Sequence, residues 1–185
     1  MSTVEILAAL LGVVNVLLVV RRSIWNYPFG LAMVSLYFFV FWDAKLYSDA
    51  VLQVFFIVIN VYGWWNWSRA ARVDDGVAVG WMGRRAQALW LGGTIASVLV
   101  WGTLMARFTD AASPMADATV AGLSVAAQCL LSLRRVESWL LWIAVDVLAI
   151  GLFASRGLNV TAALYGLFLV LAVTGLVQWA KKVAA

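Results

Sequence analysis

The sequence contains no histidine, and its 185 residues include only one cysteine and two prolines. Histidine is the commonest metal ligand and acid–base group, and neither a cluster of other metal ligands nor a nucleophile beside a base is found in its place. A Gly-Lys-Ser/Thr loop that would hold ATP phosphates is also absent. The sequence therefore predicts no enzymatic activity, no bound metal and no cofactor. The lone Cys129 rules out an intrachain disulfide.

Charge is equally scarce. Charged residues make up 12% of the chain and apolar residues 65%, against about 25% and about 45–50% in soluble domains. So large an apolar excess cannot be buried inside a protein of this length, and it predicts contact with membrane lipid. Lys and Arg stand mostly in pairs at the ends of apolar runs. This placement is typical of membrane topology signals and argues against nucleic-acid binding.

Seven apolar runs are long enough to cross about 30 Å of hydrocarbon as helices. They cover residues 4–20, 26–42, 49–67, 86–106, 115–133, 138–154 and 158–180. The first run is interpreted as a membrane helix and not as a signal peptide, because no basic segment precedes it and Arg21-Arg22 follow it directly. Pro114 is expected to start the fifth helix, whereas Pro28 either starts or kinks the second.

The distribution of basic residues predicts the orientation of the chain in the membrane. One side would carry Arg21, Arg22, Arg69, Arg72, Arg84, Arg85, Arg134, Arg135, Lys181 and Lys182. The other side would carry Lys45, Arg107 and Arg156. Because cytoplasmic loops are enriched in Lys and Arg, this imbalance predicts an N-terminus outside and a C-terminus in the cytoplasm. The longest connector, residues 68–85, lies on the predicted cytoplasmic side and contains Asp74 and Asp75.

The second half of the chain resembles the first when the two are aligned so that Trp67 falls on Trp179. This shift in residue number is called the repeat offset. The same shift pairs Ala50 with Ala162, Gly63 with Gly175, and Asn66 with Gln178. With a slip of one residue, Asn15 matches Gln128 and Arg21-Arg22 match Arg134-Arg135. Repeats of this kind are common in transporters, whose substrate binds between the halves near the middle of the membrane.

The position of the repeat predicts the architecture. Three helices reverse the direction of the chain, so an additional fourth helix makes the two halves parallel. We therefore expect an all-α membrane protein of seven transmembrane helices in a 3+1+3 arrangement. Residues 1–67 form the first repeat, 68–114 the connector and linker helix, and 115–185 the second repeat and tail. The linker helix carries Gly92, Gly93, Ser97 and Gly102, which suit close helix packing.

The third run carries amides and indoles on one helical face. The residues of this face, spaced by three or four, are Gln53, Ile57, Asn60, Trp64 and Trp67. Amides and indoles together suit a flat, polar, cationic ring. Alternatively, the tryptophans belong to the aromatic belt at the membrane surface and the amides hold helices together. The equivalent face of the last run begins at Tyr165 and is less polar, so an asymmetric site is expected.

The sixth run places Trp139, Trp142 and Asp146 on one face. Asp146 is the only carboxylate deep inside a predicted span, where an ionised carboxylate costs about 2.5–3.5 kcal/mol. Such a residue either faces a substrate pathway or has a structural partner, for which the amides of Asn15 and Gln128 are the obvious choices.

Two parts of the chain resemble a known family. The first runs from Leu52 to Phe56 and from Tyr62 to Arg69, with a W-x-x-W motif, and the second runs from Val136 to Ile143 and is followed by Gly157 and Tyr165. Both resemble the signature of bacterial PnuC vitamin transporters, and the likeness extends over nearly the whole chain. It implies a SWEET-like fold of 3+1+3 helices and facilitated diffusion across the bacterial inner membrane. It also implies a homotrimer and a cytosolic kinase that phosphorylates and traps the vitamin.

The resemblance leaves several cargoes open. Members of this family carry nicotinamide riboside most often, and thiamine, riboflavin or deoxynucleosides in some branches. Asp146 departs from the family pattern, because nicotinamide riboside carriers have an amide there. Nicotinamide riboside and thiamine both contain a flat cationic ring, which suits a carboxylate near an indole, whereas riboflavin is neutral and larger.

The sequence therefore predicts a facilitator for nicotinamide riboside, with thiamine as the alternative cargo. A proton-coupled carrier and a seven-helix receptor that does not transport are the other hypotheses. The predicted substrate-binding residues are Asn15, Gln53, Asn60, Trp64, Trp67, Gln128, Trp139, Trp142, Asp146 and Tyr165.

Overall fold

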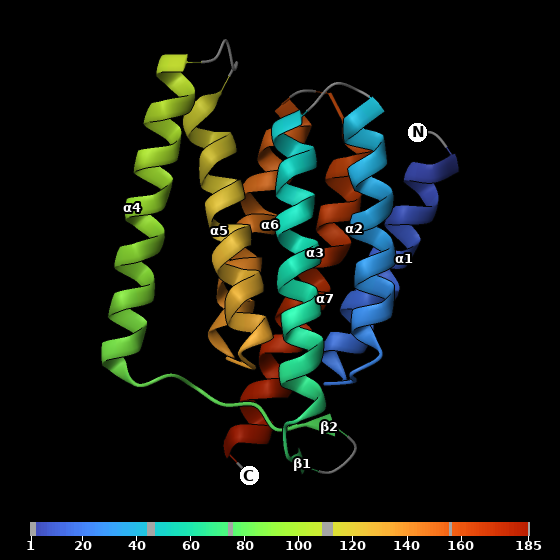
Figure 1. Ribbon diagram of the computed structural model, residues 1–185, viewed down its shortest axis with the longest axis vertical. Helices are drawn as coiled ribbons and strands as arrows, with labels where there is room; N and C mark the ends of the chain where they lie inside the picture. The colour runs from blue at the N-terminus through green and yellow to red at the C-terminus, as the bar shows by residue number, and fades with distance from the viewer. Residues whose placement is uncertain (1–2, 44–46, 74–75, 109–112, 156, 185) are drawn as a thin grey trace.

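Figure 1 shows the helices of the protein in a computed structural model. The structure describes residues 3–43, 47–73, 76–108, 113–155 and 157–184. Its helices are α1 (Thr3–Val20), α2 (Asn26–Asp43), α3 (Tyr47–Ser68), α4 (Arg84–Phe108), α5 (Pro114–Ser132), α6 (Glu137–Ser155) and α7 (Asn159–Ala184). Each helix corresponds to one predicted run, with bounds that differ by a few residues. Lys45, Asp74, Asp75 and Arg156, which entered the predictions above, lie outside the described residues.

Six of these helices, all except α2, are long and apolar enough to cross a membrane. The prediction of an all-helical, multi-pass membrane protein is thereby confirmed. Helix α2 has 18 residues, and polar Asn26 and Asp43 stand at its two ends. Pro28 lies in the first turn of α2, where it starts the helix without removing an internal hydrogen bond. Pro114 is the first residue of α5, as predicted.

The helix contacts close into a ring. Neighbours around it are α1 and α2, α2 and α3, α3 and α5, α5 and α6, α6 and α7, and α7 and α1. Helix α4 packs against α5 and lies outside this ring, at the left of Figure 1. The C-terminus and the turns after α1 and α5 lie at one end, called here the lower end, and the N-terminus lies at the upper end. The ring therefore has six members, three from each half of the chain.

The turns after α1 and α5 have the same backbone geometry. Arg22 and Arg134 both adopt a left-handed conformation, with φ of 56° and 60°. The next amide, of Ser23 and of Arg135, donates to a carbonyl five residues earlier in both turns. This pattern is typical of a helix C-terminus. Arg22 is therefore equivalent to Arg134 at the same repeat offset as the tryptophans, so the predicted one-residue slip, which matched Asn15 with Gln128, is wrong.

The two halves also hold each other by equivalent hydrogen bonds. The indole Nε1 of Trp67 on α3 donates to the Leu131 carbonyl oxygen on α5 at 3.1 Å. The indole Nε1 of Trp179 on α7 donates to the Val19 carbonyl oxygen on α1 at 3.2 Å. The two donors are related by the repeat offset, and so are the two acceptors. The exchange is reciprocal, as expected when two similar units are related by a two-fold axis.

Glycines let an aromatic ring from the neighbouring helix approach closely in each half. A Cβ atom on Gly63 would stand 2.6 Å from the Tyr27 hydroxyl, and one on Gly175 would stand 2.5 Å from Trp139 Cζ2. Tyr27 and Trp139 are again related by the repeat offset. Helix α2 packs onto α3, and α6 onto α7, with an aromatic ring against a glycine in each case. This shared packing explains why glycines match between the two halves of the sequence.

We expect Gly175→Ala to destabilise the protein by about 1–3 kcal/mol, because the added methyl group overpacks against the Trp139 ring. Gly166→Ala on the same helix is the matched control, since a Cβ there meets no atom within 4 Å. It should be neutral or stabilising by up to about 1 kcal/mol, the helix-propensity gain. The unfolding temperatures of the purified variants test this. Equal temperatures for the two would contradict the packing described here.

The connector after α3 is more ordered than the sequence predicted. It forms a small antiparallel pair of strands, β1 (Arg72–Val73) and β2 (Gly76–Val77). Nη1 of the buried Arg22 donates to the carbonyl oxygens of Val73 and Val77, both at 3.3 Å. Arg22 is thus a structural residue, in addition to its predicted role as a topology signal.

The linker helix packs only in part through the glycines expected to do so. Gly102 contacts Met115 and Ala118 of α5, as its small size predicts. Gly92 and Gly93 have no neighbouring atom within 4 Å of an added Cβ, so the expectation of close packing there is wrong. The close approach of α4 and α5 is provided instead by Gly122 of α5, which faces Val98.

Candidate functional site

The six helices of the ring enclose a cavity of about 710 Å³. All six contribute side chains to its wall, and none of the residues that line it belongs to α4. Eight of the ten predicted substrate-binding residues line this one cavity. They are Asn15, Gln53, Asn60, Gln128, Trp139, Trp142, Asp146 and Tyr165.

The other two predicted residues do not line the cavity. Trp67 is fully buried below it, within the core cluster at the lower end. Trp64 is 40% exposed on the outside of the bundle, like its neighbour Trp65. The inward face of α3 runs through Phe56 and Asn60, so Trp64 sits at the edge of that face. The placement of Trp64 and Trp67 in the substrate-binding wall is therefore corrected: Trp64 suits the aromatic belt and Trp67 the core.

An amide cluster occupies the lower part of the cavity. Gln128 Nε2 on α5 donates to Asn60 Oδ1 on α3 at 3.3 Å, and Asn60 Nδ2 donates to the Phe56 carbonyl oxygen. Asn15 Nδ2 on α1 donates to the Asn26 carbonyl oxygen at 2.6 Å. Each amide therefore keeps acceptor or donor capacity that its protein partners do not use. These hydrogen bonds join α1 to α2 and α5 to α3, and the three amides line the same part of the cavity.

Gly30 of α2 makes room for this cluster. A Cβ atom on Gly30 would stand 2.8 Å from Asn15 Nδ2 and 3.3 Å from Asn60 Oδ1. A larger residue at position 30 would overlap with the side-chain amides of both Asn15 and Asn60. The equivalent position in the second half is Trp142, which also lines the cavity.

Asp146 lines the cavity from α6 with only 4% of its surface exposed. It lies one helical turn above Trp142, on the same face of α6. Within the described part of the chain, Asp146 makes no hydrogen bond with Asn15 or Gln128, the partners considered for a structural role. Tyr165 of α7 and Tyr37 of α2 line the same cavity. The carboxylate is thus a buried group that faces a polar and aromatic wall.

The cavity also contains residues that the sequence analysis did not single out. These are aromatic side chains on α2, α3, α6 and α7: Tyr37, Phe41, Phe56, Phe153 and Phe168. Phe41 matches Phe153 and Phe56 matches Phe168 at the repeat offset. A search for aromatic pairs at that offset would have found four of the five.

The cavity wall differs in polarity between equivalent positions of the two halves, in keeping with the predicted asymmetry. Equivalent positions of the two halves line the cavity in pairs, and the polar member usually has an apolar or small counterpart. The pairs are Ser124 and Gly12, Gln128 and Val16, Asp146 and Val34, and Asn60 and Ala172. Three of these four polar residues belong to α5 and α6. A ligand would therefore bind in one orientation.

Aromatic residues close the lower end of the cavity. Trp139 and Trp179 pack edge to face at 5.4 Å, Trp67 and Trp179 lie 5.9 Å apart, and Tyr27 packs edge to face on Trp67 at 5.4 Å. All four rings are buried. Among the described residues, the buried Trp139 Nε1 and Tyr27 hydroxyl have no hydrogen-bond partner. Trp139 lines the cavity, and the other three rings form with it a buried layer below the cavity, called here the aromatic floor.

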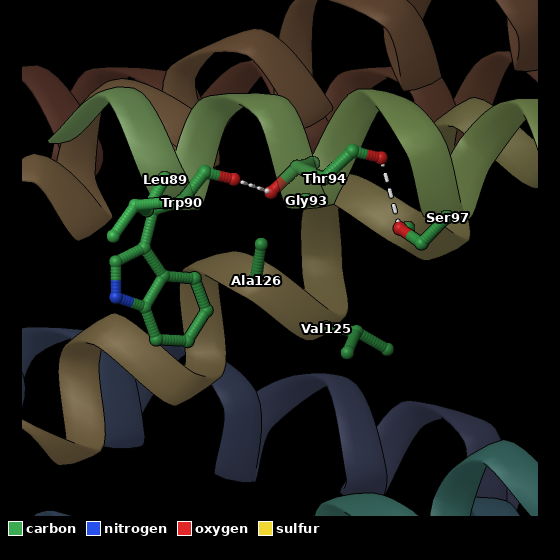
Figure 2. A pocket seen from close by; sticks show the side chains of 8 residues that line it. Leu89, Trp90, Gly93, Thr94, Ser97, Val125 and Ala126 are labelled. Carbon is green, nitrogen blue, oxygen red and sulfur yellow. Dashed lines mark hydrogen bonds between the residues drawn. The ribbon is translucent and has the colours of Figure 1, made fainter. Parts of the chain in front are cut away.

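A second hollow, of about 280 Å³, lies outside the ring between α4 and α5 (Figure 2). Its polar side chains are already satisfied within α4, because Thr94 Oγ1 donates to the Trp90 carbonyl oxygen and Ser97 Oγ to the Thr94 carbonyl oxygen. The rest of its lining is apolar or glycine, so it offers no recognition of a polar solute. The cavity inside the ring is the candidate site.

Comparison with known proteins places the chain among its relatives. A family model described as nicotinamide mononucleotide transporter matches residues 2–181. The nicotinamide riboside transporter PnuC of Escherichia coli strain K12 is 26% identical over 204 residues, which cover 97% of this chain and 85% of that protein. The chain belongs to the PnuC family. Both the resemblance found in the sequence and the prediction of a transporter family are confirmed.

A solved structure and a relative with another named cargo extend the comparison. The crystal structure of the vitamin B3 transporter PnuC superposes with a TM-score of 0.81 at 28% identity, covering 96% of this chain and 80% of that one. The riboflavin/roseoflavin transporter RibM of Streptomyces davaonensis is 25% identical, covering 95% of this chain and 83% of that protein. The chain is therefore similar to proteins that are named for different vitamins.

Proposed function

We propose that this protein transports nicotinamide riboside across the membrane by facilitated diffusion. One observation carries the proposal: the cavity between the six ring helices is lined by amides, indoles and the buried carboxylate of Asp146, in a chain whose relatives include PnuC nicotinamide riboside transporters. The amides suit the carboxamide and ribose hydroxyls, and the indole faces suit the cationic pyridinium ring. The substrate-binding residues proposed are the eight that line the cavity, from Asn15 to Tyr165.

The architecture proposed is 3+1+3, with parallel repeats related by an axis along the membrane normal. The ring of six helices, the equivalent turns and the reciprocal indole hydrogen bonds support it. The first repeat ends at residue 67, and the second begins at 115. With the basic residues on the cytoplasmic side, the lower end of the bundle and the C-terminus face the cytoplasm. The aromatic floor then closes the cavity toward the cytoplasm.

The proposed surroundings follow from the same architecture. The location is the bacterial inner membrane, and the exposed apolar side chains of α4, such as Leu89 and Ile95, contact lipid. A homotrimer is proposed from the family resemblance. Sustained net uptake depends on a cytosolic kinase, because a facilitator only brings the substrate to electrochemical equilibrium and phosphorylation removes the imported vitamin.

Counterflow in liposomes tests transport. Vesicles that contain purified protein and unlabelled nicotinamide riboside are expected to take up labelled riboside transiently, without ATP or an ion gradient. Binding without counterflow would favour the receptor hypothesis. Thiamine and riboflavin in the same assay decide the cargo, and thiamine is the alternative because it too has a flat cationic ring.

We expect Asn60→Ala to weaken binding of nicotinamide riboside by about 1–3 kcal/mol, because it leaves a polar group of the substrate unpaired in the cavity. Trp64→Ala is the matched control on the same helix and should change binding by less than about 0.5 kcal/mol, since Trp64 lies outside the cavity wall. Isothermal titration calorimetry of both variants measures the difference. An equal loss in the two variants would place the substrate elsewhere.

A further inference from the structure

The charged residues of the cavity are all acidic. Among the described residues that line it, Asp146 and Glu5 carry carboxylates and none is Lys or Arg. Glu5 lies in the first turn of α1, near the upper end. Asp146 lies in the middle of α6, about 10 Å above Trp139 from a rise of 1.5 Å per residue. Within the described part of the chain, the cavity interior thus contains an acidic group and is lined by no basic side chain that would neutralise it.

Because Asp146 is buried, its ionised form is costly in free energy. An ionised carboxylate inside a membrane protein is unfavourable unless a partner compensates it. Within the described part of the chain, no ion pair or hydrogen bond joins Asp146 to another side chain. A positively charged ligand in the cavity would supply that compensation, whereas a neutral ligand of the same shape would not.

The surroundings of Asp146 favour a flat cation. Trp142 is one turn below on the same face, so an indole and a carboxylate face the cavity together. Tyr165 and Phe168 line the cavity from α7. A carboxylate beside aromatic faces is the usual recognition chemistry for a delocalised ring cation. The equivalent position in the first half is Val34, so this acidic group exists on one side only.

We propose that Asp146 selects cargo by charge: the site prefers a ring that bears a fixed positive charge over a neutral ring of the same shape. The charged ring lies toward α6, and the sugar or other polar group of the cargo lies toward the amides of Asn60 and Gln128. This proposal rests on the proposed function. It adds that the protein distinguishes the pyridinium riboside from its uncharged reduced form.

Calorimetry with two ligands and three proteins tests the proposal. The ligands are nicotinamide riboside and dihydronicotinamide riboside, and the proteins are wild type, Asp146→Asn and Asp49→Asn. Asp49 is an exposed carboxylate in the first turn of α3 that does not line the cavity. Asp146→Asn is expected to weaken binding of the cation by about tenfold or more and binding of the neutral form by less than about twofold. Asp49→Asn should change neither by more than about twofold.

The outcomes separate this proposal from the proposed function. Equal losses of both ligands in Asp146→Asn would mean that the residue holds helices together, and no loss of either would mean that it does not contact cargo; both overturn the charge selection alone. Wild-type protein that binds no nicotinamide riboside would overturn the proposed function instead. If Asp146→Asn does not fold, the affinities of wild type and Asp146→Glu for the two ligands test the proposal instead. Both should prefer the cation by about tenfold or more, and equal affinity for the two ligands overturns the proposal.

Discussion

Liposomes that contain the purified protein and hold an inside-negative potential of 100 mV are expected to accumulate nicotinamide riboside roughly forty- to fifty-fold. The reason is electrostatic: moving one positive charge down this potential releases about 2.3 kcal/mol, and about 1.4 kcal/mol corresponds to a factor of ten. A facilitator that carries a cation needs no other energy source. A potassium gradient with valinomycin sets the potential, and labelled riboside measures the accumulation.

Two controls identify the driving force. Dihydronicotinamide riboside carries no charge on its ring and should only equalise across the membrane at the same potential. A protonophore added under the potassium clamp should leave the accumulation of the cation unchanged. Accumulation that follows an imposed pH gradient instead, and that is lost in Asp146→Asn, would establish the proton-coupled mechanism and remove facilitated diffusion.

Most of the fold could be predicted from the sequence because its elements are separated by strong local signals. Long apolar runs, paired arginines and Pro114 mark where the helices begin and end, and the structure differs by only a few residues. The repeat could be found because it preserves glycines and tryptophans that pack across helices, such as Gly63 and Gly175. The alignment of the turns was wrong by one residue, because paired arginines match equally well in two registers and only the left-handed conformation distinguishes them.

The sequence predicted which face of a helix lines the site, but it did not predict how far the site extends along that helix. Spacing of three and four residues placed Trp139, Trp142 and Asp146 together, and all three line the cavity. The same rule failed for Trp64, which is at the edge of its face, and for Trp67, which lies below the cavity. Periodicity gives the direction of a side chain around its helix axis. It does not give the depth at which a cavity ends, because that depth depends on the aromatic rings contributed by the other helices.

Gly30→Trp is expected to weaken binding of nicotinamide riboside by about a hundredfold or more, equivalent to about 3 kcal/mol. Gly30 and Trp142 occupy equivalent positions in the two halves, and both line the cavity. An indole at position 30 would fill the space in front of the amide cluster and displace Asn15 and Asn60, since even a Cβ atom stands 2.8 Å from Asn15 Nδ2. Calorimetry and counterflow measure the loss.

Gly151→Trp is the matched control, because it adds the same side chain to α6 at an exposed position with no atom within 4 Å of the new Cβ. It should bind and transport like wild type. The cavity of about 710 Å³ can hold one more indole, so Gly30→Trp should still fold, but its unfolding temperature should fall below that of the control because the two amides are displaced. Gly30→Ala should give an intermediate loss of about tenfold, since it moves the amides without filling the cavity. Wild-type affinity in Gly30→Trp would show that the substrate does not reach the amide cluster, and the site would then be restricted to Asp146, Trp142 and the aromatic residues above them.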